Sequence, residues 1–228
     1  TKDIVSSVVE TTYKTHFTEG NLNNHIGLPL TILGMSTDTE VLILEMGMNH
    51  FNEIELLSKI AQPDYGIITN IGESHIEYLG SREGITKAKL EIVNGMKDSG
   101  TLIVDGDEKL LKTQTIQVPN VLTCGFSKGN DVIISNSNIL IDQTTFTLSD
   151  GNTYHIPLLG EHHAKNAAYA ITLGKLLHVT DEQIKKGLSS LQLTGMRFEL
   201  LEGRNGASII NDAYNASPTS MKAAIEVV

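Results

Sequence analysis

The first half of the chain alternates between short apolar runs and segments in which apolar residues recur with helical spacing. Three runs are almost entirely apolar, which is typical of parallel strands covered on both faces: 41–44, 65–71 and 101–104. The segments between them, at about 52–62 and 81–96, carry apolar residues every three or four positions and predict helices. This alternation predicts an α/β fold with a mostly parallel sheet flanked by helices and joined by right-handed crossovers.

Local signals also indicate where helices begin. Residues 3–11 have helical spacing, and Pro29 suits the first turn of a short helix. Asn52 and Glu55 have the spacing of a capping box, so we expect Asn52 to cap the helix that follows it.

After about residue 130 the pattern changes to short strand-like runs at 139–141, 145–148 and 154–156. These runs predict a small antiparallel β subdomain, with a hairpin turn at 149–152.

Helical spacing returns at about 161–178 and at 181–191, where Thr180 is placed to cap the second helix. Near the end of the chain, 208–210 predicts a strand and Ser217-Pro218 predicts a helix start.

Composition restricts the class of protein. The 228 residues are 40% hydrophobic and 19% charged, and no run approaches the ~20 apolar residues of a membrane span. The N-terminus lacks the layout of a signal peptide, and the single cysteine, Cys124, cannot form an internal disulfide. We therefore expect a cytoplasmic protein with no membrane insertion. The formal charge of −10 disfavours binding to nucleic acid.

Polar residues that follow the apolar runs are the first candidates for chemistry, because ligands gather at the carboxyl ends of parallel strands. Glu45 ends one run, and Asn70 and His75 follow the next. Taken singly, Glu45 suits an exposed carboxylate and His75 a solvated loop histidine. Together, a carboxylate and an imidazole at neighbouring strand ends suit a divalent cation.

Lys87 and Lys89 follow on the next predicted helix and, two positions apart, point to different faces. Lys89 adjoins the inward-facing Ala88 and could lean towards the sheet. Periodicity alone favours a solvated lysine.

Other patterns suggest no site by themselves. No Walker loop or G-x-G-x-x-G pattern occurs in the chain, and 80–87 fails the phosphate-loop spacing. Asp105-Gly106-Asp107 favours a turn after a strand over a metal pair. His162 and His163 are adjacent, so we expect them to face apart and not to chelate one ion.

Seven segments, in this order, link these pieces: Leu44-Glu45-Met46-Gly47, Pro63-Asp64, Thr69-Asn70-Ile71 with His75, Ala88-Lys89, Gly160-Glu161-His162-His163-Ala164-Lys165-Asn166-Ala167-Ala168, Met196-Arg197-Phe198 and Asp212-Ala213-Tyr214-Asn215-Ala216-Ser217-Pro218. In that order they resemble the central, ATP-binding domain of the Mur ligases. The segments 21–29 and 45–50 look most like the branch of that family that adds D-alanyl-D-alanine.

The resemblance implies an ATP-dependent amide ligase of peptidoglycan synthesis, and through it a role in cell-wall biogenesis, cell shape and cell division. ATP would phosphorylate the carboxylate of UDP-N-acetylmuramoyl-tripeptide, and the amine of D-Ala-D-Ala would attack the acyl phosphate. Phosphorylation is needed because an unmodified carboxylate has no good leaving group, so catalysis depends on positioning and charge neutralisation. The resemblance also implies two Mg2+ ions and a monomer.

Three residues match metal-binding positions of the family. Glu45 matches the carboxylate ligand of the Mg2+ on the nucleotide phosphates, and His75 matches a ligand of the second Mg2+. Lys89 matches a lysine that is carbamylated by carbon dioxide, and its carbamate would be an anionic ligand for one of these ions.

Other matches concern the nucleotide and the substrate. Asn166 and Arg197 match nucleotide-contacting positions, with Arg197 near the transferred phosphate and therefore among the catalytic candidates with Glu45, His75 and Lys89. Asp212 and Tyr214 match nucleotide contacts made from the C-terminal domain. Asn24 is a candidate on the substrate side.

By the same resemblance, 1–203 is a central domain without its phosphate loop, which would stand immediately before Thr1, and 204–228 is the truncated start of the C-terminal domain. Since that loop holds the β- and γ-phosphates, we expect the isolated chain to use ATP negligibly. Two alternatives remain. One is a ligase like folylpolyglutamate synthase, which the asparagine-rich loop disfavours; the other is an inert nucleotide- or metal-binding fragment without turnover.

Overall fold

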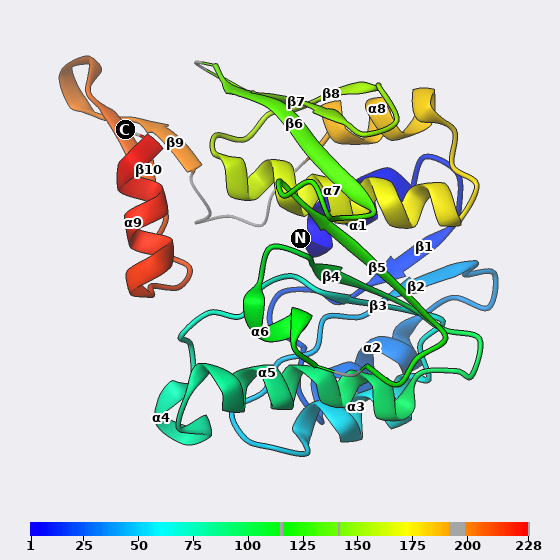
Figure 1. The fold of residues 1–228 in the computed structure, drawn as a ribbon. Coiled ribbons are helices and arrows are strands. Elements are labelled where there is room, and N and C mark those ends of the chain that lie inside the picture. Colours follow the sequence, from blue (N-terminus) through cyan, green and yellow to red (C-terminus); the bar gives the residue numbers. More distant parts are fainter. Residues whose placement is uncertain (115, 141, 192–198, 228) are drawn as a thin grey trace.

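The computed structural model describes residues 1–227 apart from 115, 141 and 192–198 (Figure 1). The strands are β1 (Thr15–Phe17), β2 (Val41–Ile43), β3 (Tyr65–Ile68), β4 (Thr101–Asp105), β5 (Asn120–Gly125), β6 (Val132–Ile139), β7 (Thr144–Leu148), β8 (Thr153–Ile156), β9 (Glu199–Glu202) and β10 (Ser208–Asn211). The α-helices are α1 (Lys2–Val9), α2 (Gly27–Gly34), α3 (Glu53–Ala61), α4 (Ile76–Leu79), α5 (Arg82–Leu90), α6 (Lys109–Lys112), α7 (Glu161–Leu176), α8 (Asp181–Ser189) and α9 (Pro218–Val227), and the 3-10 helices are η1 (Glu91–Gly95) and η2 (Arg204–Gly206). Within these ranges, no helix has the length and apolar character needed to cross a membrane.

Strands β3 to β8 form one sheet in sequence order, parallel from β3 to β6 and antiparallel from β6 to β8. The mostly parallel α/β fold and the antiparallel extension, with its turn between β7 and β8, are therefore confirmed. Strands β1 and β2 pair in parallel as a separate two-stranded sheet. The prediction that 41–44 is buried on both faces is wrong. Every residue of β2 is half-buried, because among the described strands only β1 lies beside it.

Helices cover both faces of the sheet (Figure 1). Helices α1, α7 and α8 pack over one face, and α2, α3 and α5 pack over the other. Along β4 the side chains alternate between the two cores, with Ile103 in the first and Leu102 and Val104 in the second. Burying such a side chain stabilises the fold by about 1.5–3 kcal/mol. Hydrophobic burial on both faces therefore determines where β4 lies.

Helix ends follow some sequence signals and not others. Thr180 accepts a hydrogen bond from the Gln183 N–H, and the Gln183 side chain accepts one from the Thr180 N–H, so the predicted cap of α8 is confirmed. The predicted capping box at Asn52 is wrong, because Asn52 has a left-handed backbone with φ 69° and makes no side-chain cap. The carboxylate of Glu91 accepts from the backbone N–H groups of Asn52 and Glu55 instead. Glu91 belongs to η1, so the helix predicted over 81–96 divides into α5 and η1.

The C-terminal strands β9 and β10 pair as an antiparallel hairpin, and α9 follows them beside the main body in Figure 1. The strand predicted at 208–210 and the helix predicted from Ser217-Pro218 are confirmed by β10 and α9. Strands β1, β5 and β9 and helices α4 and α6 were not predicted. The strand predicted at 139–141 is misplaced, because β6 covers Val132–Ile139 and Leu140 is not in a strand. The domain division between residues 203 and 204 stays a prediction.

Close packing of α8 on α1 leads to a stability prediction. A Cβ on Gly187 in α8 would lie 2.3 Å from the carbonyl oxygen of Ser7. Gly187→Ala should push the two helices apart and lower the free energy of unfolding by about 1–3 kcal/mol. Gly129→Ala is the matched control, because nothing lies within 4 Å of its added Cβ. Urea unfolding gives both values, and equal effects would contradict this account of the packing.

Candidate functional site at the carboxyl edge of the sheet

Glu45 lies just beyond the end of β2 and is held by the segment that follows β1. Its backbone N–H donates to the hydroxyl of the buried Thr18 at 2.9 Å. Its Oε1 accepts from the side-chain amide of Asn23, also at 2.9 Å. Within the described part of the chain, Glu45 forms no ion pair, so no lysine or arginine neutralises its charge. The place of Glu45 after an apolar run predicts it as a site residue, whereas Asn23, 22 positions earlier, carries no such local signal.

Lys89 in α5 reaches the carboxyl end of β3. Its Nζ donates to the backbone carbonyl of Asn70 at 2.8 Å and lies 3.4 Å from the side-chain oxygen of the same residue. Lys89 is half-buried, and burial lowers the pKa of its ammonium group to about 8. The solvated position that periodicity favoured is therefore wrong for Lys89 and correct for the exposed Lys87.

This pKa changes the chemistry available to Lys89. At pH 7.5 roughly a quarter of the side chain is the neutral amine, against about one part in a thousand for a lysine of ordinary pKa. Only the neutral amine is a nucleophile. Lys89 can therefore react with an electrophile such as carbon dioxide under conditions in which an exposed lysine hardly reacts.

His75 lies on the loop after β3 and immediately precedes α4. Its side chain is exposed, and its backbone is left-handed with φ 67°. That conformation is uncommon for a residue with a Cβ and is often found at functional sites. No described contact joins His75 to Glu45 or Lys89, so the convergence of these three residues stays a prediction.

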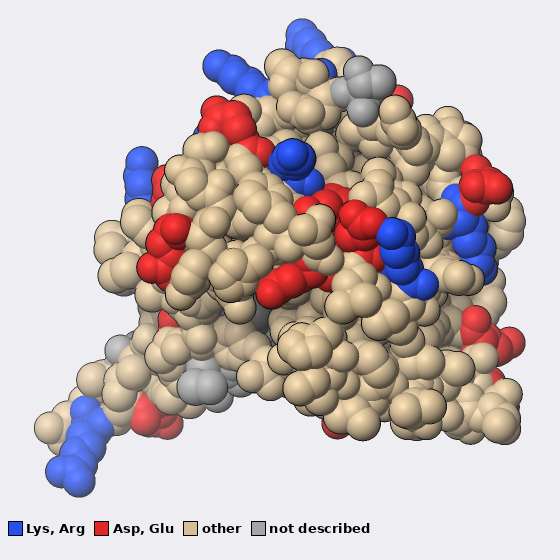
Figure 2. Space-filling model, turned by 90° about the horizontal axis from the view of Figure 1, so that it is seen from below, with Lys and Arg blue, Asp and Glu red and all other residues tan. Residues whose placement is uncertain are grey.

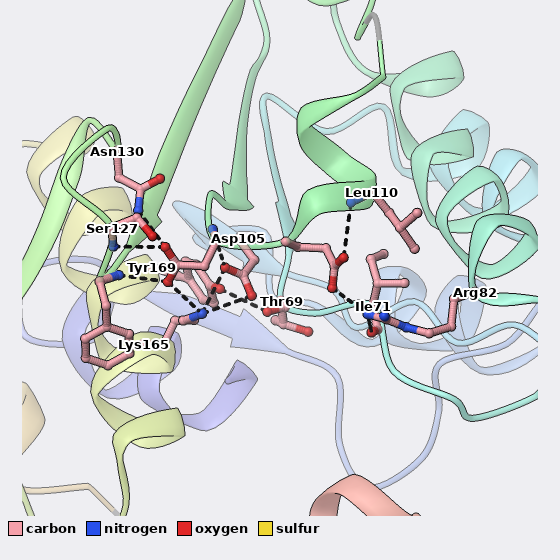
Figure 3. Close-up of polar contacts among 12 residues, drawn as sticks. Thr69, Ile71, Arg82, Asp105, Leu110, Ser127, Asn130, Lys165 and Tyr169 are labelled. Carbon is pink, nitrogen blue, oxygen red and sulfur yellow. Dashed lines mark hydrogen bonds and ion pairs between the residues drawn. The ribbon is translucent and has the colours of Figure 1, made fainter.

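A second polar cluster joins the ends of β4 and β5 to helix α7 (Figure 3). The Lys165 ammonium lies between two carboxylates, 2.9 Å from Asp105 and 3.1 Å from Asp107. Asp107 accepts three further hydrogen bonds from the loop after β5, donated by the backbone N–H groups of Phe126 and Ser127 and by the side-chain amide of Asn130. The predicted turn at 105–107 is confirmed. Its partner Lys165 was missed because it lies 60 residues further along the chain.

Opposite effects act on the pKa values in this cluster. Burial favours the neutral form of Asp107, but the hydrogen bonds from Phe126, Ser127 and Lys165 outweigh burial and hold the pKa of Asp107 well below 3.8. Burial likewise favours neutral Lys165, but Asp105 and Asp107 raise its pKa above 10.5. Asp107 and Lys165 therefore stay charged at neutral pH, and the cluster ties α7 to the edge of the sheet.

The predicted nucleotide-contacting residue Asn166 lies in the second turn of α7. Asn166 accepts a hydrogen bond from the Thr1 hydroxyl at 2.9 Å, which joins α7 to the start of α1. The rings of His162 and His163 have centroids 4.0 Å apart, so the prediction that they face apart is wrong. Both lie in the first turn of α7, where adjacent imidazoles can bend towards each other. Desolvation lowers the pKa of His162 while the carboxylate of Asp212 acts in the opposite direction, so Asp212 lies within electrostatic range of α7.

The surroundings of two further predicted site residues, Asn24 and Tyr214, are described by the structure. The side-chain oxygen of Asn24 accepts from the N–H groups of Ile26 and Gly27, so it is engaged at the start of α2. Tyr214 is half-buried and belongs to the segment that connects β10 to α9. Arg197 lies outside the described residues.

A cleft of about 700 Å3 opens at the same edge, between the loops that follow β3 and β4. Its lining includes Ile76, Ser81, Arg82, Asp107, Glu108 and Leu110. The Arg82 guanidinium joins the two loops, since it donates to the Ile71 carbonyl at 2.9 Å and to the Glu108 carboxylate at 2.6 Å (Figure 3). The cleft and the Lys165 cluster share Asp107, so they form one continuous polar edge.

Charge on the molecular surface adds little to this picture. On the face seen from below, lysine and arginine side chains are interspersed with acidic ones and do not gather into one basic area (Figure 2). Long-range attraction therefore does not single out that face as a binding surface. The short-range contacts at the carboxyl edge define the candidate site.

The donor set at this edge fits Mg2+ only in part. Among the described residues, no three His, Cys, Asp or Glu side chains gather where they could hold a metal ion. Glu45 and His75 would supply one oxygen and one nitrogen, and a carbamate on Lys89 would supply a further anionic oxygen. Mg2+ normally completes its coordination with water and substrate phosphates, so such a sparse protein set is compatible with a nucleotide-bound ion.

The fold and its polar edge define an α/β domain of the kind that binds ligands at the carboxyl ends of parallel strands. The chain belongs to the Mur ligase family, because the sequence profile of the Mur ligase middle domain matches residues 1–174. It is 52% identical over all 228 residues to the UDP-N-acetylmuramoyl-tripeptide--D-alanyl-D-alanine ligase of Bacillus subtilis. The chain spans about half the length of that relative.

Solved structures agree with this assignment. MurF from Acinetobacter baumannii superposes with a TM-score of 0.89 at 32% identity, over 99% of this chain and 50% of that one. MurF ligase from Thermotoga maritima in complex with ADP gives a TM-score of 0.88 at 28% identity, over 99% of this chain and 53% of that one. An FPGS from L. casei, at 13% identity and a TM-score of 0.72 over 99% of this chain and 67% of that one, shares the fold alone.

The Lys165 cluster leads to a second stability prediction. Lys165→Met should leave the carboxylates of Asp105 and Asp107 without their cation and lower the free energy of unfolding by about 3–5 kcal/mol. Because the pKa of Asp107 is depressed, its contribution is present above its unfolded pKa of 3.8 and is lost as the pH falls below that value. Lys97→Met is the control, since it breaks an exposed pair with Asp64 and should cost at most ~1 kcal/mol. Chemical denaturation at pH 7 measures both, and similar losses would contradict the importance of the buried cluster.

The low pKa of Lys89 can be measured directly. In protein labelled with 13C-lysine, one side-chain resonance should titrate with a midpoint near pH 8 when carbon dioxide is excluded, because burial disfavours the ammonium form. Lys89→Arg should remove that resonance and so assign it. A midpoint above about 10 for the assigned resonance would contradict the burial effect.

Proposed function

We propose that the chain is the middle part of an ATP-dependent ligase that joins D-Ala-D-Ala to UDP-N-acetylmuramoyl-tripeptide in peptidoglycan synthesis. The observation that carries the reaction class is Lys89, a half-buried lysine of depressed pKa at the carboxyl edge of the sheet. The choice of substrates rests on the 52% identity to the Bacillus subtilis ligase of that name. ATP use is further supported by the ADP complex of the Thermotoga maritima relative.

The proposed chemistry sets the tasks of the site. A carboxylate resists attack by an amine until one of its oxygens is converted into a leaving group, which phosphorylation by ATP achieves. The amine then forms the amide bond and inorganic phosphate leaves. Several anionic groups must be brought together for this, so the site must neutralise charge and position each group.

Lys89 would be carbamylated. Its neutral amine attacks carbon dioxide, a nitrogen–carbon bond forms, and one proton is released, which leaves an anionic carbamate. Glu45, His75 and this carbamate would hold Mg2+, which when bound neutralises charge on the phosphates and polarises the transferred group. The Asn70 carbonyl, which accepts from Lys89 in the unmodified state, keeps the amine at the carboxyl end of β3.

Nucleotide contacts are assigned on the same basis. Asn166 and Arg197 would contact the nucleotide, with Arg197 near the transferred phosphate and so among the catalytic residues. Asp212 and Tyr214 would contact it from the C-terminal domain, which would begin near residue 204. Asn24 would act on the substrate side through its segment, since its side chain already binds the start of α2.

The rest of the assignment concerns the whole protein. The phosphate loop would lie before Thr1, and the remaining parts of the ligase would flank 1–228. Soluble nucleotide-linked substrates fit a cytoplasmic enzyme, and we propose that it acts as a monomer.

The test uses the full-length protein and follows ATP-dependent formation of the amide. Lys89→Ala should reduce the rate by at least ~100-fold, because it removes a proposed anionic metal ligand. Acetate or bicarbonate added to the variant should restore part of the rate by supplying an anion in the vacated space. Lys87→Ala, on the exposed side of the same helix, should keep the normal rate.

Controls separate the alternatives. D-Ala-D-Ala should be the preferred amine donor, and a preference for glutamate would favour the folylpolyglutamate synthase-like alternative. The isolated 228-residue chain should release negligible phosphate from ATP. Turnover by that isolated chain with both peptide substrates would show that the phosphate loop is dispensable. A normal rate for Lys89→Ala without additives would exclude the proposed role of its carbamate.

A further inference from the structure

The segment between β1 and α2 holds Glu45 through two residues. Thr18, fully buried, accepts from the Glu45 backbone N–H and donates its own backbone N–H to Ile43. Asn23 donates its side-chain amide to Oε1 of Glu45. The main chain and the carboxylate of Glu45 are therefore held by different residues, and among the residues that the structure describes only Asn23 donates to the carboxylate.

Asn23 is itself held in place. Its backbone carbonyl accepts from the Gly47 N–H at 2.8 Å, on the far side of Glu45. A Cβ on Gly47 would lie 3.0 Å from the Asn23 side-chain amide, so the absence of a side chain at Gly47 makes room for that amide. The 45–47 turn and Asn23 therefore fit together as one unit.

The direction of the hydrogen bond follows from chemistry. An ionised carboxylate can only accept, so the amide nitrogen of Asn23 must face Oε1. Asn23 is neutral, so it orients the carboxylate without cancelling its charge, as a lysine would. With Oε1 engaged, Oε2 is the oxygen left for a cation.

We propose that Asn23 is a positioning residue for Glu45, which fixes the carboxylate so that Oε2 is presented to the divalent cation that accompanies the nucleotide. This inference rests on the proposed function, because it takes Glu45 as a metal ligand. Partners that orient a metal ligand typically change metal affinity 10- to 100-fold when they are removed. In this role Asn23 would act through Glu45, to which it donates its side-chain amide.

The test measures binding and needs no turnover. The full-length protein is titrated with the non-hydrolysable ATP analogue AMPPNP at several Mg2+ concentrations by calorimetry. Asn23→Ala and Asn23→Leu, the second of which keeps the side-chain volume, should each raise the Mg2+ concentration for half-maximal effect by about 10-fold or more. Affinity for AMPPNP without Mg2+ should be unchanged, which a merely structural defect would not produce. Asn21→Ala, an exposed asparagine in the same loop, should leave the Mg2+ dependence as it is.

A double-mutant cycle with Glu45→Gln shows whether Asn23 acts through Glu45. Glu45→Gln should strongly raise the Mg2+ concentration needed for half-maximal effect. Adding Asn23→Ala to this variant should then change that concentration by less than about twofold. If Glu45→Gln raises this Mg2+ concentration and Asn23→Ala alone does not, the positioning role proposed for Asn23 is wrong, whereas the proposed metal site is retained. Equal effects of Asn23→Ala in both backgrounds would also overturn the inference, since Asn23 would then act independently of Glu45. If Glu45→Gln has no effect, the proposed metal site fails and the inference fails with it.

Discussion

A parallel sheet has to be covered on both faces, because its strands carry apolar side chains in both directions. Strand β4 shows this requirement in full, since all five of its residues are buried. Helices α1, α7 and α8 cover one face and α2, α3 and α5 cover the other. In β4 the polar residues Thr101 and Asp105 accordingly lie at the two ends of the strand. Since the strands are parallel, their carboxyl ends meet at one edge, and the location of the candidate site is a consequence of hydrophobic burial.

Two lysines at this edge show how much the immediate surroundings decide. Lys165 lies between Asp105 and Asp107, and these charges outweigh burial and raise its pKa. Lys89 faces the uncharged oxygens of Asn70 and forms no ion pair with any described residue, so burial lowers its pKa to about 8. The first lysine is a permanent cation that fastens α7 to the sheet. The second spends part of its time as a neutral amine, which is the property that the proposed carbamylation requires.

Different elements of the fold hold the individual candidate residues in place. The loop after β1 orients Glu45, α5 delivers Lys89, and α7 supplies Asn166 beside the cluster that anchors the helix. Under the proposed function, the parts of the longer relatives that lie outside this chain would complete such an edge. Under that proposal Glu45 and His75 would supply only two of the metal ligands, and water and phosphate oxygens would provide the rest.

Amino-acid order by itself predicted the strand–helix alternation, the antiparallel extension, the cap at Thr180 and the positions of Glu45, Asn70 and His75 after their strands. Each of these depends on side-chain periodicity or on neighbours within a few residues, which can be read locally. The strand β5, the capping of α3 by Glu91, the burial of Lys89 and the partners Asn23 and Lys165 could not be predicted in this way. They arise where residues 19 to 60 positions apart meet. Only the packed tertiary structure brings such residues together, because hydrogen bonds and charge interactions act over a few ångströms in space whatever the separation along the chain.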